Sequence, residues 1–140
     1  VLDHTSRLWA TRHAAGALEV NRALAAALAA ADRLTTVDEM EAWSETRLDD
    51  QGWTAAPALA MAVAAALAAD GDADRLYRLA CWHSGDSDSV GAIAGNLYGA
   101  AVGADALPAD LVAGNEATEL LTLLTQHLNH DLDVSALYPR

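Results

Sequence analysis

Apolar residues recur along the chain at the three- to four-residue spacing of amphipathic helices, and no alternating strand pattern runs for more than a few residues. The last helical stretch carries leucines at this spacing: Leu120, Leu121, Leu124 and Leu128. The spacing predicts helices over residues 5–32, 53–70, 73–82, 89–102 and 116–130, and a short helix from residue 37. We therefore expect an all-α fold in a single region over residues 1–140.

Two helix starts are marked by local signals. Thr36-Val37-Asp38-Glu39 is a capping box, in which the Thr36 hydroxyl accepts from the Glu39 N–H and Glu39 reaches back. The stretch from Trp53 to Pro57 opens the next helix, because a proline in the first turn loses no helical hydrogen bond. Between them, the polar run 49–52 predicts a loop.

The predicted helix over 89–102 contains a stripe of glycines at every fourth position: Gly91, Gly95, Gly99 and Gly103. A glycine in a helix interior costs about 1 kcal/mol relative to alanine. Close approach by another helix would offset this cost, so we expect the helix to lie at the centre of the fold. Core anchors are expected at the four tryptophans, one of which could stack on a nucleotide base: Trp9, Trp43, Trp53 and Trp82.

The amino-acid composition argues against some classes of binding function. Hydrophobic residues make up 53% of the 140 positions, enough for a core. The formal net charge is −12 with only 8 Lys and Arg, which argues against direct binding in a nucleic-acid groove or to an anionic membrane surface. Cys81 is the single cysteine, so we expect a buried thiol, a reducing compartment and a cytoplasmic protein. The alanine-rich runs are too short to span a bilayer.

The most polar stretch between apolar helices is Asp86-Ser87-Asp88-Ser89. One such residue is an ordinary helix cap. Two carboxylates this close repel each other unless a cation lies between them, so capping and a metal site both stay open. Oxygen ligands would favour Mg²⁺, Mn²⁺ or Ca²⁺ over zinc. An EF-hand is excluded, because Leu97 stands where its twelfth residue should be a glutamate.

Other polar clusters have simpler interpretations. Asp70-Gly71-Asp72-Ala73-Asp74 is interpreted as an acidic loop and helix start. His83 either positions a ligand phosphate or a water, or is a core histidine with its hydrogen bonds satisfied, and the second interpretation is favoured. His127 and His130 lie near a helix C-terminus, where cationic histidine is favourable, and are weak zinc candidates.

The stretch from His83 to Gly103, followed by Leu107-Pro108, resembles the C-terminal signature of the ADP-ribosylglycohydrolase family. That signature has Gly-Asp-x-Asp-Ser/Thr, an Ala/Gly-rich helix with repeating glycines, and Leu-Pro or Ile-Pro before the last helix. Weaker likeness extends to Gly52-Trp53 and to residues 8–14. The resemblance implies an all-α protein with two Mg²⁺ ions, or Mn²⁺, in a central cleft.

The resemblance also implies an activity and a ligand set. Family members hydrolyse the bond between ADP-ribose and its acceptor, often a protein arginine or serine, by attack of a metal-bound water. By motif position, the metal ligands would be Asp86, Asp88 and Ser89. The residues just before them are assigned to substrate binding: His83, Ser84 and Gly85. No catalytic residue is assigned.

The family's N-terminal ligand motif, Thr/Ser-Asp-Asp-Thr, does not occur, and Asp49-Asp50 is followed by Gln51. The chain therefore resembles the C-terminal half of a family member. Its expected partners are an ADP-ribosylated substrate and an N-terminal half of the same fold, in cis or in trans. The alternative is a degenerate, non-catalytic helical module that binds a partner or ligand.

Overall fold

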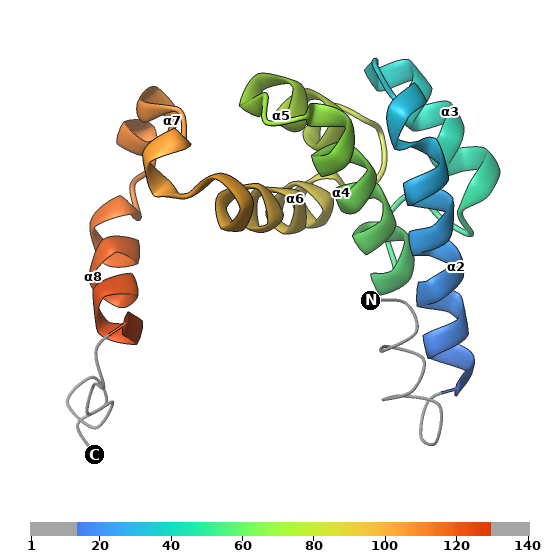
Figure 1. Ribbon diagram of the computed structural model, residues 1–140, viewed down its shortest axis with the longest axis horizontal. Coiled ribbons are helices and arrows are strands. Elements are labelled where there is room, and N and C mark those ends of the chain that lie inside the picture. Colours follow the sequence, from blue (N-terminus) through green and yellow to red (C-terminus); the bar gives the residue numbers. More distant parts are fainter. Residues whose placement is uncertain (1–13, 130–140) are drawn as a thin grey trace. The chain divides into compact units, whose positions relative to one another are not determined.

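A computed structural model describes residues 14–129, and the predicted helical positions before residue 14 lie outside this range. The regular elements of the described part are all helical, which confirms the all-α class (Figure 1). The chain divides after residue 106 into two compact units. The first unit contains α2 (Ala14–Ala30), η1 (Ala31–Arg33), α3 (Val37–Arg47), α4 (Ala55–Ala69), α5 (Ala73–Cys81), α6 (Ser87–Val102) and η2 (Ala104–Ala106). The second contains α7 (Ala109–Gly114) and α8 (Thr118–Asn129).

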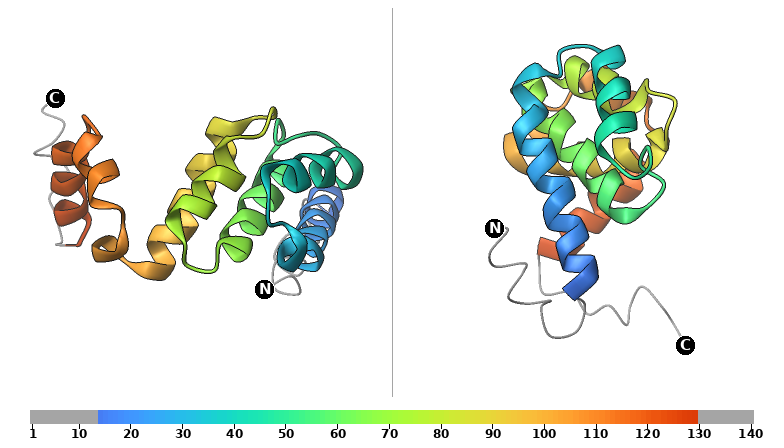
Figure 2. Two further views of the ribbon diagram at one scale, coloured as in Figure 1. Left: turned by 90° about the horizontal axis from the view of Figure 1, so that it is seen from above. Right: turned by 90° about the vertical axis from the view of Figure 1, so that its right-hand side faces the viewer.

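Helix α4 is the centre of the first unit. Its residues are apolar on every side, and a helix of that kind is buried rather than amphipathic. It packs against α2, α5 and α6, and Figure 2 shows it enclosed by these neighbours. Most of its buried side chains are alanines, which let neighbouring backbones approach closely, and Met61 fills the larger space between them.

Helix α6 packs on α4 and α5 through three buried residues at four-residue spacing: Val90, Ala94 and Tyr98. The Tyr98 hydroxyl donates a hydrogen bond of 2.9 Å to the Gly71 carbonyl, which joins α6 to the turn between α4 and α5. The prediction that α6 is the central helix is therefore wrong, because α4 occupies that position.

The glycine stripe of α6 is not covered as expected. Only Gly91 has a close neighbour, since a Cβ there would lie 2.6 Å from Cys81 Sγ. A Cβ at Gly95 or Gly99 would meet no other atom within 4 Å in the described part of the chain. Gly103 ends the helix with a φ of +82°. The thiol predicted to be buried is only half-buried at Cys81, and this partial burial raises its pKa.

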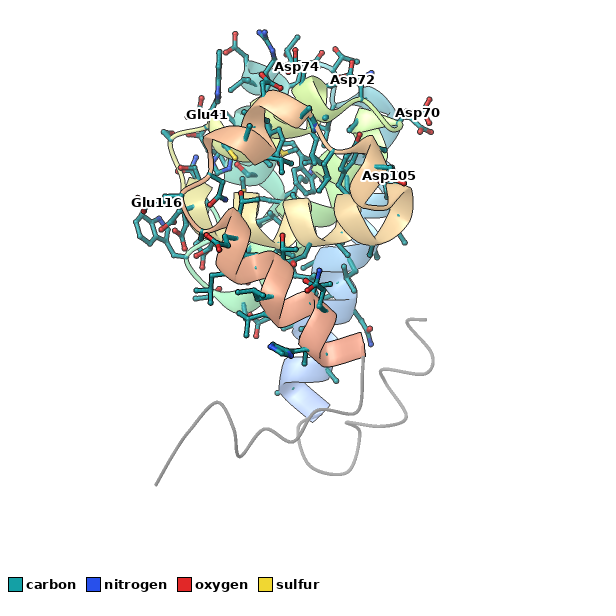
Figure 3. All side chains as sticks on the ribbon, turned by 90° about the vertical axis from the view of Figure 1, so that its left-hand side faces the viewer. Glu41, Asp70, Asp72, Asp74, Asp105 and Glu116 are labelled. Carbon is teal, nitrogen blue, oxygen red and sulfur yellow. The ribbon has the colours of Figure 1, made fainter. Side chains whose placement is uncertain are left out.

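The helix starts predicted at Val37 and Ala73 are confirmed, and α4 begins at Ala55 within the predicted opening stretch from Trp53 to Pro57. Both capping-box hydrogen bonds of Thr36 and Glu39 are present at the start of α3. Hydrogen bonds from Thr35 and Thr36 lower the pKa of Glu39. Asp72 caps α5 by accepting a hydrogen bond of 3.1 Å from the Arg75 N–H. Figure 3 shows Asp70, Asp72 and Asp74 on the outer surface around this turn, as expected for an acidic loop and helix start.

The prediction of tryptophan core anchors is wrong for two residues. Trp53 is 71% exposed in the loop before α4, and Trp82 is 66% exposed at the end of α5. The guanidinium of Arg78 lies 5.1 Å from the centre of the Trp82 ring, a cation–π contact at the surface. Trp53 precedes α4 in a loop and Trp82 is the C-cap of α5, so neither lies on a buried helical face. Trp43 is half-buried, and Trp9 lies outside the described residues.

The second unit contains one helix that the sequence did not predict. The six residues of α7 are too few for a helical period to be recognised. The Thr118 hydroxyl donates a hydrogen bond of 2.6 Å to the Val112 carbonyl, which ties the start of α8 to α7. Helix α8 lies within the predicted range, and His130 falls outside the described residues.

None of the helices within residues 14–129 is both long enough and apolar enough to cross a membrane.

The central position of α4 gives a test of the fold. Met61→Ala removes a side chain with 0% exposure and should lower the free energy of unfolding by about 2–5 kcal/mol. Leu67→Ala on the same helix removes a side chain that is 49% exposed and should cost less than about 1 kcal/mol. Urea unfolding followed by circular dichroism measures both, and equal losses would contradict this packing.

Candidate metal centre

Asp86 lies at the junction between the α5–α6 turn and α6. Its carbonyl accepts a hydrogen bond of 3.1 Å from the Val90 N–H, so Asp86 is the N-cap of α6. The helix therefore begins at Ser87, two residues earlier than the predicted start at Ser89. This earlier start places Asp88 and Ser89 in the first helical turn.

The three predicted metal ligands come together at this helix start. A hydrogen bond between the carboxyl groups raises the pKa of Asp86 and lowers that of Asp88. The Ser89 hydroxyl also hydrogen-bonds to Asp86 and partly opposes the rise of its pKa. The Ser89 N–H donates a hydrogen bond of 2.8 Å to Asp88 Oδ1. Two carboxyl groups and one hydroxyl thus share a small volume.

This donor set suits a hard cation but does not surround one. All its side-chain donors are oxygens, which Mg²⁺ and Mn²⁺ prefer. Within residues 14–129, no group of three or more His, Cys, Asp or Glu side chains could hold a metal ion. Asp86, Asp88 and Ser89 by themselves do not make a complete coordination sphere.

His83 is buried, with 6% exposure, and both ring nitrogens are engaged. The Gly85 N–H can only donate, so its 3.1 Å contact makes His83 Nδ1 an acceptor. The proton is then on Nε2, which donates to the Ala80 carbonyl at 3.0 Å. Burial lowers the pKa of His83, in agreement with this neutral tautomer. The interpretation of His83 as a satisfied core histidine agrees with this burial and these hydrogen bonds, and its assignment to substrate binding stays a prediction.

Ser84 and Gly85 are held by segments distant in the sequence. Both the N–H and the hydroxyl of Ser84 donate to the Glu41 carboxylate, the N–H at 3.1 Å. These hydrogen bonds lower the pKa of Glu41. A Cβ at Gly85 would collide with the carbonyl oxygen of Gln51. The polar groups of Ser84 and Gly85 are thus engaged within the chain, and their assignment to substrate binding stays a prediction.

The loop from residue 48 to 54 supports the turn from the other side. The Gln51 carbonyl accepts a hydrogen bond of 2.9 Å from the Asp86 N–H. Gly52 follows with a φ of +95°, and a Cβ there would lie 3.6 Å from Asp86 Cβ. Asp50 orders the loop by accepting hydrogen bonds from Gly52, Trp53 and Thr54. Partial burial raises the pKa of Asp50, but these hydrogen bonds outweigh it and lower the pKa overall.

Sequence reasoning missed Glu41 and Gln51 as neighbours of the motif. No local pattern marks Glu41, because its partner Ser84 is 43 positions away. For the 48–54 loop, the only sequence signal of a link to the motif was the weak family resemblance at Gly52-Trp53. A cavity of about 440 Å³ lined by Arg22, Arg47 and neighbouring residues of α2 and α4 contains none of the three predicted ligands.

The family model described as ADP-ribosylglycohydrolase matches residues 3–136. The chain belongs to the ADP-ribosylglycohydrolase family. No curated protein and no solved structure gave a match. Membership of this family supports a hydrolase of ADP-ribose linkages, and it agrees with the all-α fold of this ADP-ribosylglycohydrolase-family chain.

Two glycines of this family member should respond in opposite directions to the same substitution. Gly85→Ala forces a Cβ against the Gln51 carbonyl and should destabilise the fold by about 1–3 kcal/mol. Gly95→Ala meets open space in a helix interior and should stabilise it by about 1 kcal/mol. Thermal and urea unfolding of the two variants measure this. Destabilisation by Gly95→Ala would mean that another segment covers the stripe.

The neutral His83 predicts a pH dependence of stability. Its folded-state pKa is lowered, so its contribution is intact above the unfolded pKa of about 6.5 and falls as the pH drops towards the folded-state value. Glu41 and Asp86 face the ring and oppose this lowering. His83→Gln keeps one donor and one acceptor and should flatten the curve of unfolding free energy between pH 7 and 5. Curves of equal slope for both proteins would contradict the assignment.

Proposed function

We propose that this protein is a divalent-cation-dependent hydrolase that cleaves the bond between ADP-ribose and its acceptor. One observation carries the proposal: Asp86, Asp88 and Ser89 converge at the start of α6 in a chain that belongs to the ADP-ribosylglycohydrolase family. Family membership indicates that the bond cleaved is an ADP-ribose linkage. The oxygen donors of the three residues support a divalent cation as the cofactor.

Mg²⁺ or Mn²⁺ is the cofactor that these residues fit. The carboxyl groups of Asp86 and Asp88 interact directly, and a cation between the two carboxylates would relieve their repulsion. When bound, the ion would act as a Lewis acid that lowers the pKa of water and orients ribose hydroxyls. Asp86, Asp88 and Ser89 would contribute oxygen ligands, and the N-terminal end of α6 would hold them in a fixed spacing.

Two carboxylates and one hydroxyl do not complete the octahedral sphere that Mg²⁺ requires. We propose that the remaining protein ligands come from an N-terminal half of the same fold, in cis or in trans. Two ions are expected in the complete site. The acceptor, whether arginine, serine or another group, would be recognised by a surface that both halves form.

Replacement of the paired carboxylates tests the proposal. Asp86→Asn together with Asp88→Asn should weaken Mn²⁺ binding to the chain more than about tenfold, because two anionic ligands are lost. The same double variant should abolish Mg²⁺-dependent release of ADP-ribose from modified arginine and serine peptides, measured with the N-terminal half supplied. Electron paramagnetic resonance of free Mn²⁺ follows binding, and chromatography follows release.

Asp72→Asn together with Asp74→Asn is the matched control. These residues have the same spacing and the same charge, and they lie at the start of α5 on the exposed surface. The control should bind Mn²⁺ as the unsubstituted chain does. Unchanged release after substitution of Asp86 and Asp88 would refute the proposal. Absence of release and of any cation-induced rise in melting temperature would instead favour a non-catalytic helical module.

A further inference from the structure

Glu41 is a charged side chain that reaches the α5–α6 turn from a different element. It lies on α3, is labelled in Figure 3, and accepts from both donors of Ser84 across 43 positions of sequence. A single carboxylate that takes the N–H and the hydroxyl of one residue fixes both its backbone and its side chain. Hydrogen bonds to a charged acceptor are stronger than neutral ones.

The turn that Glu41 contacts stabilises its carboxylate in the charged form. The hydrogen bonds from Ser84 lower the pKa of Glu41, and the neighbouring His83 lowers it further. Ser84 lies two residues before Asp86. Within the described residues, Glu41, Asp86 and Asp88 do not form a group that could hold a metal ion.

The turn is held on both sides of Gly85. Glu41 holds Ser84 before it, and the Gln51 carbonyl holds the Asp86 N–H after it. Gly85 permits this close approach because it has no side chain to collide with Gln51. The direction in which Asp86 leaves the turn is therefore set by α3 and by the 48–54 loop as well as by α6.

We propose that Glu41 is a positioning residue for the Asp86–Asp88–Ser89 donor set, which it orients by holding Ser84. The cation-binding consequence rests on the proposed function, whereas the ordering of the turn does not. Exchange of the Asp86 amide proton reports on the order of the turn. Its acceptor is the Gln51 carbonyl, which stays in place when Glu41 is substituted, so any change in exchange comes from the turn and not from a lost acceptor.

Amide hydrogen exchange and Mn²⁺ titration on the full chain test this role. Glu41→Ala should speed exchange of the Asp86 amide about tenfold and weaken Mn²⁺ binding about tenfold, with exchange in α4 unchanged. Glu41→Gln should restore most of the slow Asp86 exchange and most of the Mn²⁺ affinity, because its amide oxygen can still accept from Ser84. Asp38→Ala, an exposed carboxylate of the same helix, controls for charge and should change neither.

The outcomes separate this proposal from the proposed function. Unchanged Asp86 exchange in Glu41→Ala, or an equal rise throughout α4, would overturn it. Faster Asp86 exchange with unaltered Mn²⁺ affinity would overturn the link to the donor set. Failure of the unsubstituted chain to bind Mn²⁺ even with the N-terminal half supplied would contradict the proposed function, and the exchange comparison would then decide the role of Glu41 alone.

Discussion

The first unit depends on the burial of one alanine-walled helix. Helix α4 has neighbours on several sides, and small side chains allow each of them to approach its backbone closely. Alanine loses almost no side-chain entropy on burial, so such packing costs little ordering. Trp53 and Trp82 lie at the surface, outside the helix faces that this packing buries.

This packing also determines where the polar chemistry can gather. Helices α5 and α6 both rest on α4, so the turn that joins them is fixed at its two ends. Its middle is fixed separately by Glu41 and Gln51. The donor set at the start of α6 is thus held by helix packing, by a charged hydrogen bond and by a loop carbonyl. These are three different kinds of interaction, and none of them is local in sequence.

The parts of the structure that the sequence predicted are those governed by local rules. The capping box at Thr36, the helix start after the acidic loop at residues 70–74 and the long periodic helices depend on residues within one or two turns of each other. The motif was recognisable for the same reason, since Asp86, Asp88 and Ser89 are neighbours in sequence. What failed was the choice of central helix, because Gly95 and Gly99 indicate only that side chains are missing, not that another helix covers them. The role of Glu41 could not be predicted from the sequence, because its partner Ser84 lies 43 positions away.

The open face of α6 affects how this helix can move. Glycine weakens the intrinsic tendency of a segment to be helical, so α6 relies on the packing of Val90, Ala94 and Tyr98 for its persistence. Loss of this packed face would remove most of what keeps the helix folded. Undocking of α6 would therefore also release the carboxyl pair at its N-terminal end. The donor set thus depends on the docking of α6 as well as on Glu41 and Gln51, which hold the turn before it.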